Sequence, residues 1–175
     1  MYRATRAGLI FALLAILFIA CSGRQVIQAD RVDKVDRIPF PEAEYAALPI
    51  IGSGTATVTG QAFLKTRGGD VKTAAGNSVL LNPVTSYSRQ WFETEYIGGK
   101  PLADYDPRLE QFMVAKIVDA QGNFTFKNVP AGDYYVTTGV FWEAPTTNGL
   151  KRQGATLSQQ VHVSDGQTVE IILTK

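Results

Sequence analysis

Histidine and cysteine, which supply many of the nucleophiles, proton carriers and metal ligands in proteins, occur only once each among the 175 residues, as His162 and Cys21. A zinc site of paired cysteines and histidines therefore lacks its ligands, and no intramolecular disulfide can form. The Gly-x-Ser-x-Gly motif is also absent, so a nucleophilic triad lacks parts. His162 lies between two valines, and strand alternation turns it to the opposite, solvated face. We predict a protein that is not an enzyme and carries no cofactor, no metal and no catalytic residue.

The chain also lacks any block of one charge, because its 17 basic and 16 acidic residues are nearly balanced. Without a basic block, the chain lacks the main electrostatic feature that binds nucleic acid, so we predict no nucleic-acid partner. Asp104, Asp106 and Glu110 lie close together in sequence, but their spacing is not that of an EF-hand loop. A solvated acidic loop is therefore favoured over a calcium site.

No apolar run reaches the roughly 20 residues that a membrane-spanning helix needs. The longest run, LIFALLAILFIA at 9–20, follows a lead that carries Arg3 and Arg6. A charged lead before about a dozen apolar residues is typical of a secretory signal peptide. We predict a signal peptide over residues 1–20 rather than a single-pass anchor.

The residues at the predicted cleavage point favour a lipid anchor. Phe18-Ile19-Ala20-Cys21 resembles the lipobox of bacterial lipoproteins, although Phe stands where Leu is usual. Lipidation of Cys21 would consume the unpaired thiol, and several acyl chains on one residue hold a protein firmly in a membrane. The resemblance implies a cell-envelope lipoprotein, and Ser22 rather than Asp after the cysteine favours the outer membrane if the cell is Gram-negative.

Residues 21–53 show no sustained helical or strand period. Their charges alternate, and Pro39 and Pro41 flank a phenylalanine. We predict a lipidated tether that spaces a domain from the membrane, part of which can lie along the domain surface.

Residues 54–175 alternate small or polar residues with apolar ones, which predicts half-buried strands. In FTFKNV, Phe124 and Phe126 share the buried face and Thr125 faces water. The three runs 112–119, 124–129 and 133–144 are predicted to meander, and Asp165-Gly166 predicts a closing hairpin. About seven short strands with closely spaced turns indicate an all-β chain, folded as a single antiparallel β-sandwich.

The motifs DAQGNFTF at 119–126 and NVPAGDYYV at 128–136 resemble the carboxypeptidase regulatory-like domain, which has a transthyretin-like (prealbumin-like) β-sandwich. TVTGQ, NSVLLNP and VSDGQTVEIIL fit the same pattern in the same order, so the resemblance covers most of residues 54–175. It implies an accessory module that packs, binds or spaces other parts. The wider superfamily includes carbohydrate-binding modules, and the fold alone decides no function.

One departure from this pattern is an insertion over residues 84–111. We predict a helix over 86–97 that is capped by Ser86 and ended by Gly98-Gly99. Its aromatic side chains either close one end of the sandwich or form a binding platform. The platform residues would be Trp91, Phe92 and Tyr96 of the helix, with Trp142 as a possible neighbour.

Two functions from different classes remain open at this point. One is a non-enzymatic envelope lipoprotein that presents the sandwich to a protein partner. The other is a carbohydrate-binding module that recognises glycan or cell-wall sugar through the aromatic residues of the insertion.

Overall fold

The computed structural model describes residues 33–175, so the predicted signal peptide and Cys21 lie outside the described residues. Eight strands form two four-stranded sheets, which confirms the predicted β-sandwich with a helical insertion. One strand was not predicted from the sequence. It is β2 (Val71–Thr73), which lies in a stretch rich in turn residues. No helix within residues 33–175 is long and apolar enough to cross a membrane.

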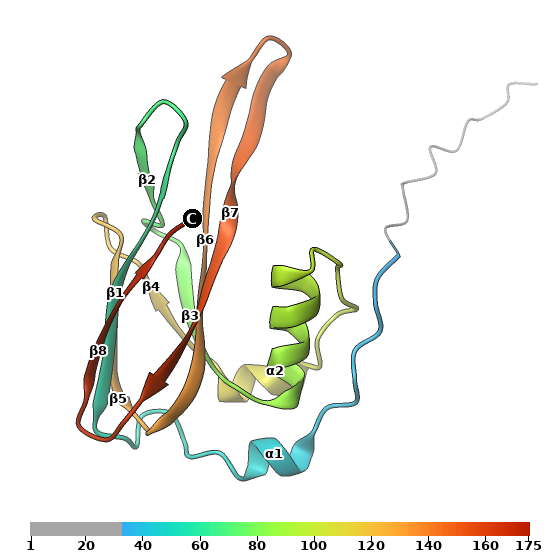
Figure 1. The fold of residues 1–175 in the computed structure, drawn as a ribbon, viewed down its shortest axis with the longest axis vertical. Coiled ribbons are helices and arrows are strands. Elements are labelled where there is room, and N and C mark those ends of the chain that lie inside the picture. The colour runs from blue at the N-terminus through green and yellow to red at the C-terminus, as the bar shows by residue number, and fades with distance from the viewer. Residues whose placement is uncertain (1–32) are drawn as a thin grey trace, which may run out of the picture. The chain divides into compact units, whose positions relative to one another are not determined.

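The first sheet is built around β1 (Ala56–Lys65), as Figure 1 shows. β1 pairs antiparallel with β2 at its end and with β5 (Asn123–Val129) along most of its length. On its other side it pairs in parallel with β8 (Thr168–Leu173), the only parallel strand pair in the described part of the chain. There is no space for a side chain at Gly60 of β1, because an added Cβ would lie 2.3 Å from the Ile171 carbonyl oxygen.

The second sheet has the strand order β4-β3-β6-β7, and all its pairs are antiparallel. β3 (Ser78–Pro83) and β6 (Gly132–Thr146) are its central strands, and β4 (Val114–Ile117) and β7 (Gly149–Val163) are its edges. β6 and β7 run on beyond their neighbours as a long two-stranded ribbon (Figure 1).

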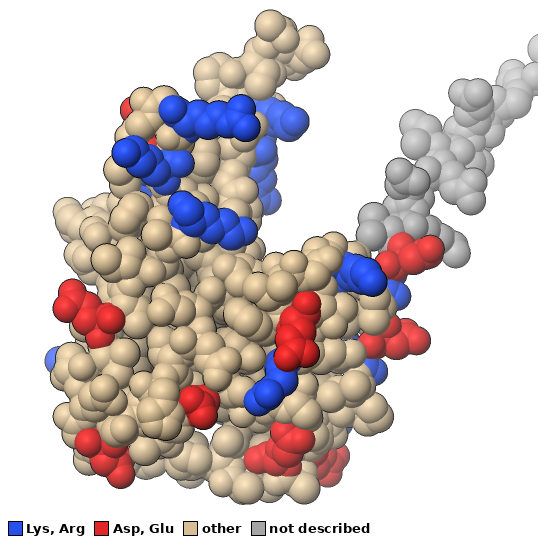
Figure 2. Space-filling model, in the orientation of Figure 1, with Lys and Arg blue, Asp and Glu red and all other residues tan. Residues whose placement is uncertain are grey.

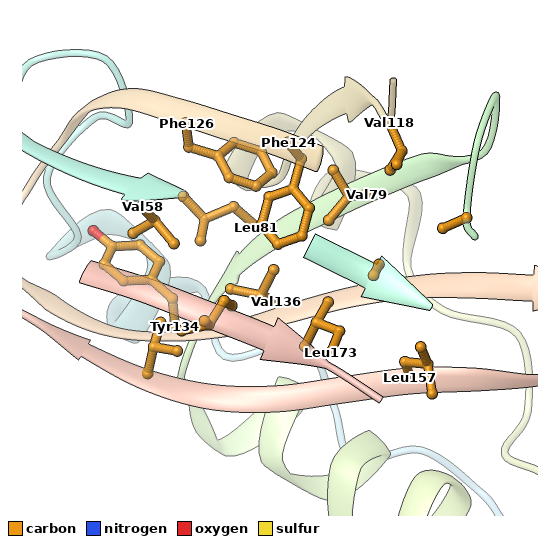
Figure 3. Packing of buried hydrophobic residues seen from close by; sticks show 14 of the residues in the cluster. Val58, Val79, Leu81, Val118, Phe124, Phe126, Tyr134, Val136, Leu157 and Leu173 are labelled. Atoms are coloured by element: carbon orange, nitrogen blue, oxygen red, sulfur yellow. The ribbon is translucent and has the colours of Figure 1, made fainter. Parts of the chain in front are cut away.

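The hydrophobic core lies between the two sheets (Figure 3). Phe124 and Phe126 of β5 are 3% and 1% exposed, and Thr125 between them is exposed, which confirms the predicted strand register. The two rings meet edge to face at 6.0 Å between centroids. Val79 and Leu81 of β3 face them from the second sheet (Figure 3).

The predicted meander is wrong, because consecutive strands change sheet. β4 pairs with β3 in the second sheet, β5 pairs with β1 in the first, and β6 returns to the second. The turn of Asp119 to Asn123 therefore crosses from one sheet to the other, and so does the Pro-Ala-Gly-Asp bend. The alternation of apolar and polar residues predicts which side of a strand is buried. The same alternation is compatible with any neighbouring strand, so it does not predict the pairing.

The predicted closing hairpin is also wrong. β7 pairs with β6 along its whole length, and β8 pairs with β1. The Asp165-Gly166 dipeptide forms a tight turn, in which Gly166 has a φ of +68°, but this turn leads from the second sheet to the first.

The true hairpin joins β6 to β7 through Thr147-Asn148, with Gly149 at a φ of +106°. The pairing of β6 and β7 is continuous past Gly139, although a glycine inside a strand often marks a bulge. At Gly154 the two strands approach closely, because an added Cβ would lie 2.0 Å from the Val140 carbonyl oxygen.

Candidate functional site

The insertion begins with a capped helix. Thr85 is its N-cap, and Thr85 and Ser88 form a reciprocal capping box. The helix consists of α2 (Ser86–Gln90) and a π-helix, η1 (Trp91–Ile97), and it ends at Gly98-Gly99. The predicted helix is therefore present, and its cap lies one residue before the predicted one.

The helix packs on the outer face of the second sheet and does not close an end of the sandwich. Phe92 stacks on Tyr135 of β6, with ring centroids 4.5 Å apart, and Tyr135 is 2% exposed. The hydroxyl oxygen of Tyr96 accepts a 3.0 Å hydrogen bond from the backbone N–H of Ser158. Because β7 is an edge strand, this contact satisfies a donor that no neighbouring strand reaches.

Trp91 stacks on Tyr96 at 5.9 Å and stays half-buried. The predicted platform residues Trp91, Phe92 and Tyr96 thus meet, but Phe92 and Tyr96 face the sheet. Trp142 does not join them, since it lies on the opposite face of β6 and packs against the core between the sheets.

A second apolar cluster, the lower aromatic cluster, forms where residues 33–48 cross the insertion. Its buried members are Tyr45, Tyr87 and Leu109. Four half-buried residues pack around them: Phe40, Leu48, Phe112 and Met113. Residues 33–48 were predicted to belong to the tether, and in the structure they are held against the domain.

Tyr45 is the centre of the lower aromatic cluster. It belongs to the short helix α1 (Glu42–Ala46) and is 1% exposed. It stacks on Phe40 at 4.6 Å, and its hydroxyl accepts a 3.0 Å hydrogen bond from the Thr85 hydroxyl. Burial raises the pKa of Tyr45, so its hydroxyl stays protonated.

Each acidic side chain of the predicted loop interacts with a different partner. Asp104 pairs with Lys34 at 2.8 Å, and Asp106 pairs with Arg108 at 2.7 Å. The hydrogen bonds from Arg108 lower the pKa of Asp106 to about 2. Glu110 accepts a hydrogen bond from Tyr105, which raises the pKa of the Tyr105 hydroxyl. Among residues 33–175, no group of three His, Cys, Asp or Glu side chains could hold a metal ion.

The only histidine of the chain lies away from the insertion. His162 of β7 is exposed, and its Nδ1 lies 3.0 Å from an Asp133 carboxylate oxygen on the neighbouring strand. The pair faces solvent at the rim of the second sheet.

A cavity of about 340 Å³ lies between the outer face of the second sheet and the insertion. Leu80, Asn82 and Thr137 form its sheet side. The insertion and its flank contribute an aromatic and apolar wall, made of Tyr87, Trp91, Tyr105, Leu109 and Met113. Its volume is in the range of small-ligand sites, which are typically apolar with a few placed polar groups.

The polar groups of the cavity come from three parts of the chain. Glu95 accepts a hydrogen bond from the Leu102 backbone N–H through one carboxylate oxygen. Arg37 donates from Nε to the Ala103 carbonyl at 2.6 Å, and its guanidinium lies 5.3 Å from the centre of the Tyr87 ring. These contacts hold an acceptor and a donor group at the cavity wall.

Asn82 supplies the least satisfied polar atom of the cavity. Its Oδ1 is buried and has no hydrogen-bond partner among the described residues. A buried acceptor without a donor costs about 1–3 kcal/mol.

Sequence reasoning named Trp91 but missed Arg37 and Asn82. Asn82 stands in a β-strand pattern as an ordinary outward residue before a proline. Arg37 lies in the predicted tether, 45 positions away in the sequence. No local pattern indicates that they meet.

The fold and the cavity define a β-sandwich protein with a candidate small-ligand site built on the outer face of one sheet. A solved structure from Pseudomonas aeruginosa, described as "a putative carbohydrate binding protein", is similar to this chain. The TM-score is 0.70 and the identity 26%, and the match covers 80% of this chain and 100% of that one.

The major pilin subunit BcpA of Bacillus cereus matches with a TM-score of 0.39 at 15% identity, over 69% of this chain and 29% of that one. No protein-family model matches the chain. No curated protein matches it either.

Proposed function

We propose that this protein is a non-enzymatic, lipid-anchored envelope protein that binds carbohydrate in the cavity beneath the insertion. The cavity carries the proposal. An indole at its wall offers a flat ring for a sugar face, and polar groups of both kinds surround it. Glu95 can accept from sugar hydroxyls and Arg37 can donate to them, and the side-chain amide of Asn82 lines the same cavity.

The structural similarity supports the same ligand class. The Pseudomonas aeruginosa protein is described as "a putative carbohydrate binding protein", and the whole of that chain matches this one. Its identity of 26% supports a shared fold, and the ligand of this chain is argued from its own cavity.

A glycan array followed by titration of the best oligosaccharide tests the proposal. Trp91→Ala is expected to weaken binding by about 2 kcal/mol or more, because a stacked aromatic anchor is lost. Asn82→Leu is also expected to weaken binding while leaving the protein at least as stable, since the unpaired buried acceptor disappears.

Phe92→Ala is the matched control from the same helix. Because Phe92 packs on Tyr135 and does not line the cavity, its truncation should lower the melting temperature more than Trp91→Ala does. Unchanged glycan affinity in the Trp91→Ala and Asn82→Leu proteins would contradict the cavity as the site. Co-purification of one stoichiometric envelope protein, with no glycan bound, would favour a protein-interaction module instead.

The anchor is tested separately, at Cys21. The Cys21→Ser protein is expected to stay unprocessed and to lose metabolic labelling by radioactive palmitate, because the chain has no other thiol. Fractionation of cell envelopes provides the second measurement, which is the amount of the protein that stays with the membrane. Label that persists on the Cys21→Ser protein would rule out this anchor.

A further inference from the structure

Positive charge is concentrated at one end of the sandwich, which we call the basic end. It consists of residues 64–73, around the β1–β2 turn, and residues 141–153, which form the β6–β7 ribbon. These residues include five basic and two acidic side chains, a net charge of +3. The rest of the described chain has eight basic and thirteen acidic side chains, a net charge of −5. Figure 2 shows Lys and Arg gathered at this end and most Asp and Glu elsewhere.

The two halves of the basic end lie beside each other, because β2 contacts β6. Lys72 is the cross-strand partner of Leu64, which is buried in the core. Lys151 lies an even number of residues from Leu157, so both are on the core-facing side of β7. The two side chains therefore start from opposite sheets, and each lies on the side of its strand that faces the other sheet.

No salt bridge within residues 33–175 includes any of the five basic side chains of the basic end. Arg152 instead lies over the ring of Phe141, with the guanidinium carbon 4.3 Å from the ring centroid. Like charges held near one another without internal partners favour the binding of an external anion.

We propose that the basic end is a second carbohydrate-binding surface, which binds acidic polysaccharides through their carboxylate or phosphate groups. This inference rests on the proposed carbohydrate function and extends it to a class of polymer. The cationic groups lie on two separate hairpins, so a chain with repeated anionic groups can contact both.

The apolar surface of the basic end is too small to favour a lipid bilayer instead. Its exposed large apolar residues are Val71, Phe141 and Leu150, which belong to three different strands. Arg152 covers the ring of Phe141, and the hairpin tip reads Thr-Thr-Asn-Gly. Interfacial binding needs a continuous apolar face beside the basic residues.

Titration of the full chain with polygalacturonate, at 50 mM and 200 mM NaCl, tests the inference. We expect binding that weakens roughly tenfold between the two salt concentrations, as for a polyanion that releases counterions. Dextran, a neutral polymer, should not bind at this surface. Exchange of Lys72, Lys151 and Arg152 for Gln should weaken polygalacturonate binding at least tenfold.

The matched control exchanges Lys100, Lys116 and Lys127 for Gln, which removes the same charge from exposed positions outside the basic end. An equal loss in this control, or binding that is independent of salt, would overturn the inference. Vesicles of phosphatidylglycerol that bind as tightly as polygalacturonate would assign the surface to a membrane. The exchange of Lys72, Lys151 and Arg152 should leave binding of the neutral oligosaccharide from the glycan array unchanged, so failure of the cavity and failure of the basic end give different results.

Discussion

Replacing Phe126 by Ala is expected to lower the free energy of unfolding by roughly 3–5 kcal/mol. Phe126 is 1% exposed, and its ring fills the space between the sheets beside Phe124 (Figure 3). The loss removes buried apolar surface and leaves a cavity that the surrounding strands can only partly close. Domains are typically stable by about 5–15 kcal/mol, so the change is a large part of the total. Denaturant unfolding monitored by circular dichroism measures it.

Thr125→Ala is the control for this prediction, because Thr125 lies on the same strand and faces solvent. Its hydroxyl is within 3.1 Å of the Thr59 hydroxyl on the neighbouring strand. This contact is exposed, so it is expected to contribute little to the free energy of unfolding. Similar losses from the two substitutions would mean that the strand is shifted by one residue, which exchanges its two faces.

Replacing Tyr45 by Ala is expected to have a comparable effect, roughly 3–5 kcal/mol, although the residue lies outside the sandwich. Its ring packs against Phe40 and Phe112, with centroids 4.6 Å and 4.7 Å away. Without Tyr45, residues 33–48 lose the side chain that fixes them to the insertion. The result is expected both in denaturant unfolding and in limited proteolysis, as new cleavage between residues 33 and 53.

Tyr45→Phe separates packing from hydrogen bonding in this cluster. The variant keeps the ring but leaves the Thr85 hydroxyl without this partner, so a loss of about 1 kcal/mol is expected. Full protection from protease in the Tyr45→Ala protein would contradict the role of Tyr45 in holding residues 33–48.

The strands themselves could be predicted because burial acts on each strand separately. The period-2 pattern of β1 and β5 is explicit in the sequence, and the structure buries the expected sides, including Phe124 and Phe126. The insertion helix could be predicted because its cap and its terminating glycines are local signals.

Strand pairing could not be predicted in the same way, because it depends on contacts far apart in the sequence. Asp165-Gly166 forms the turn that its residues favour, yet the strand that follows pairs with β1. A turn motif fixes the local backbone and does not choose the partner of the next strand. The Asn148-Gly149 signal at the true hairpin is no stronger.

Only the part of the candidate site that comes from a single segment could be predicted from the sequence. Trp91 follows from an aromatic-rich helix in a long insertion. The cavity also needs Asn82 from a sheet face and Arg37 from residues that read as a tether. Their meeting depends on packing of the lower aromatic cluster, which brings the two segments together.

The parallel pair of β1 and β8 joins the first strand of the sandwich to the last. Thr57 lies opposite Thr168, with nearly the whole domain between them in sequence. Closing so long a loop is entropically unfavourable before its contacts form, and such pairings slow folding. A ribosome-bound chain that lacks residues 168–173 leaves one edge of β1 without its partner. The first sheet can therefore be completed only after residues 168–173 have been synthesised, since no earlier strand within residues 33–175 takes the place of β8.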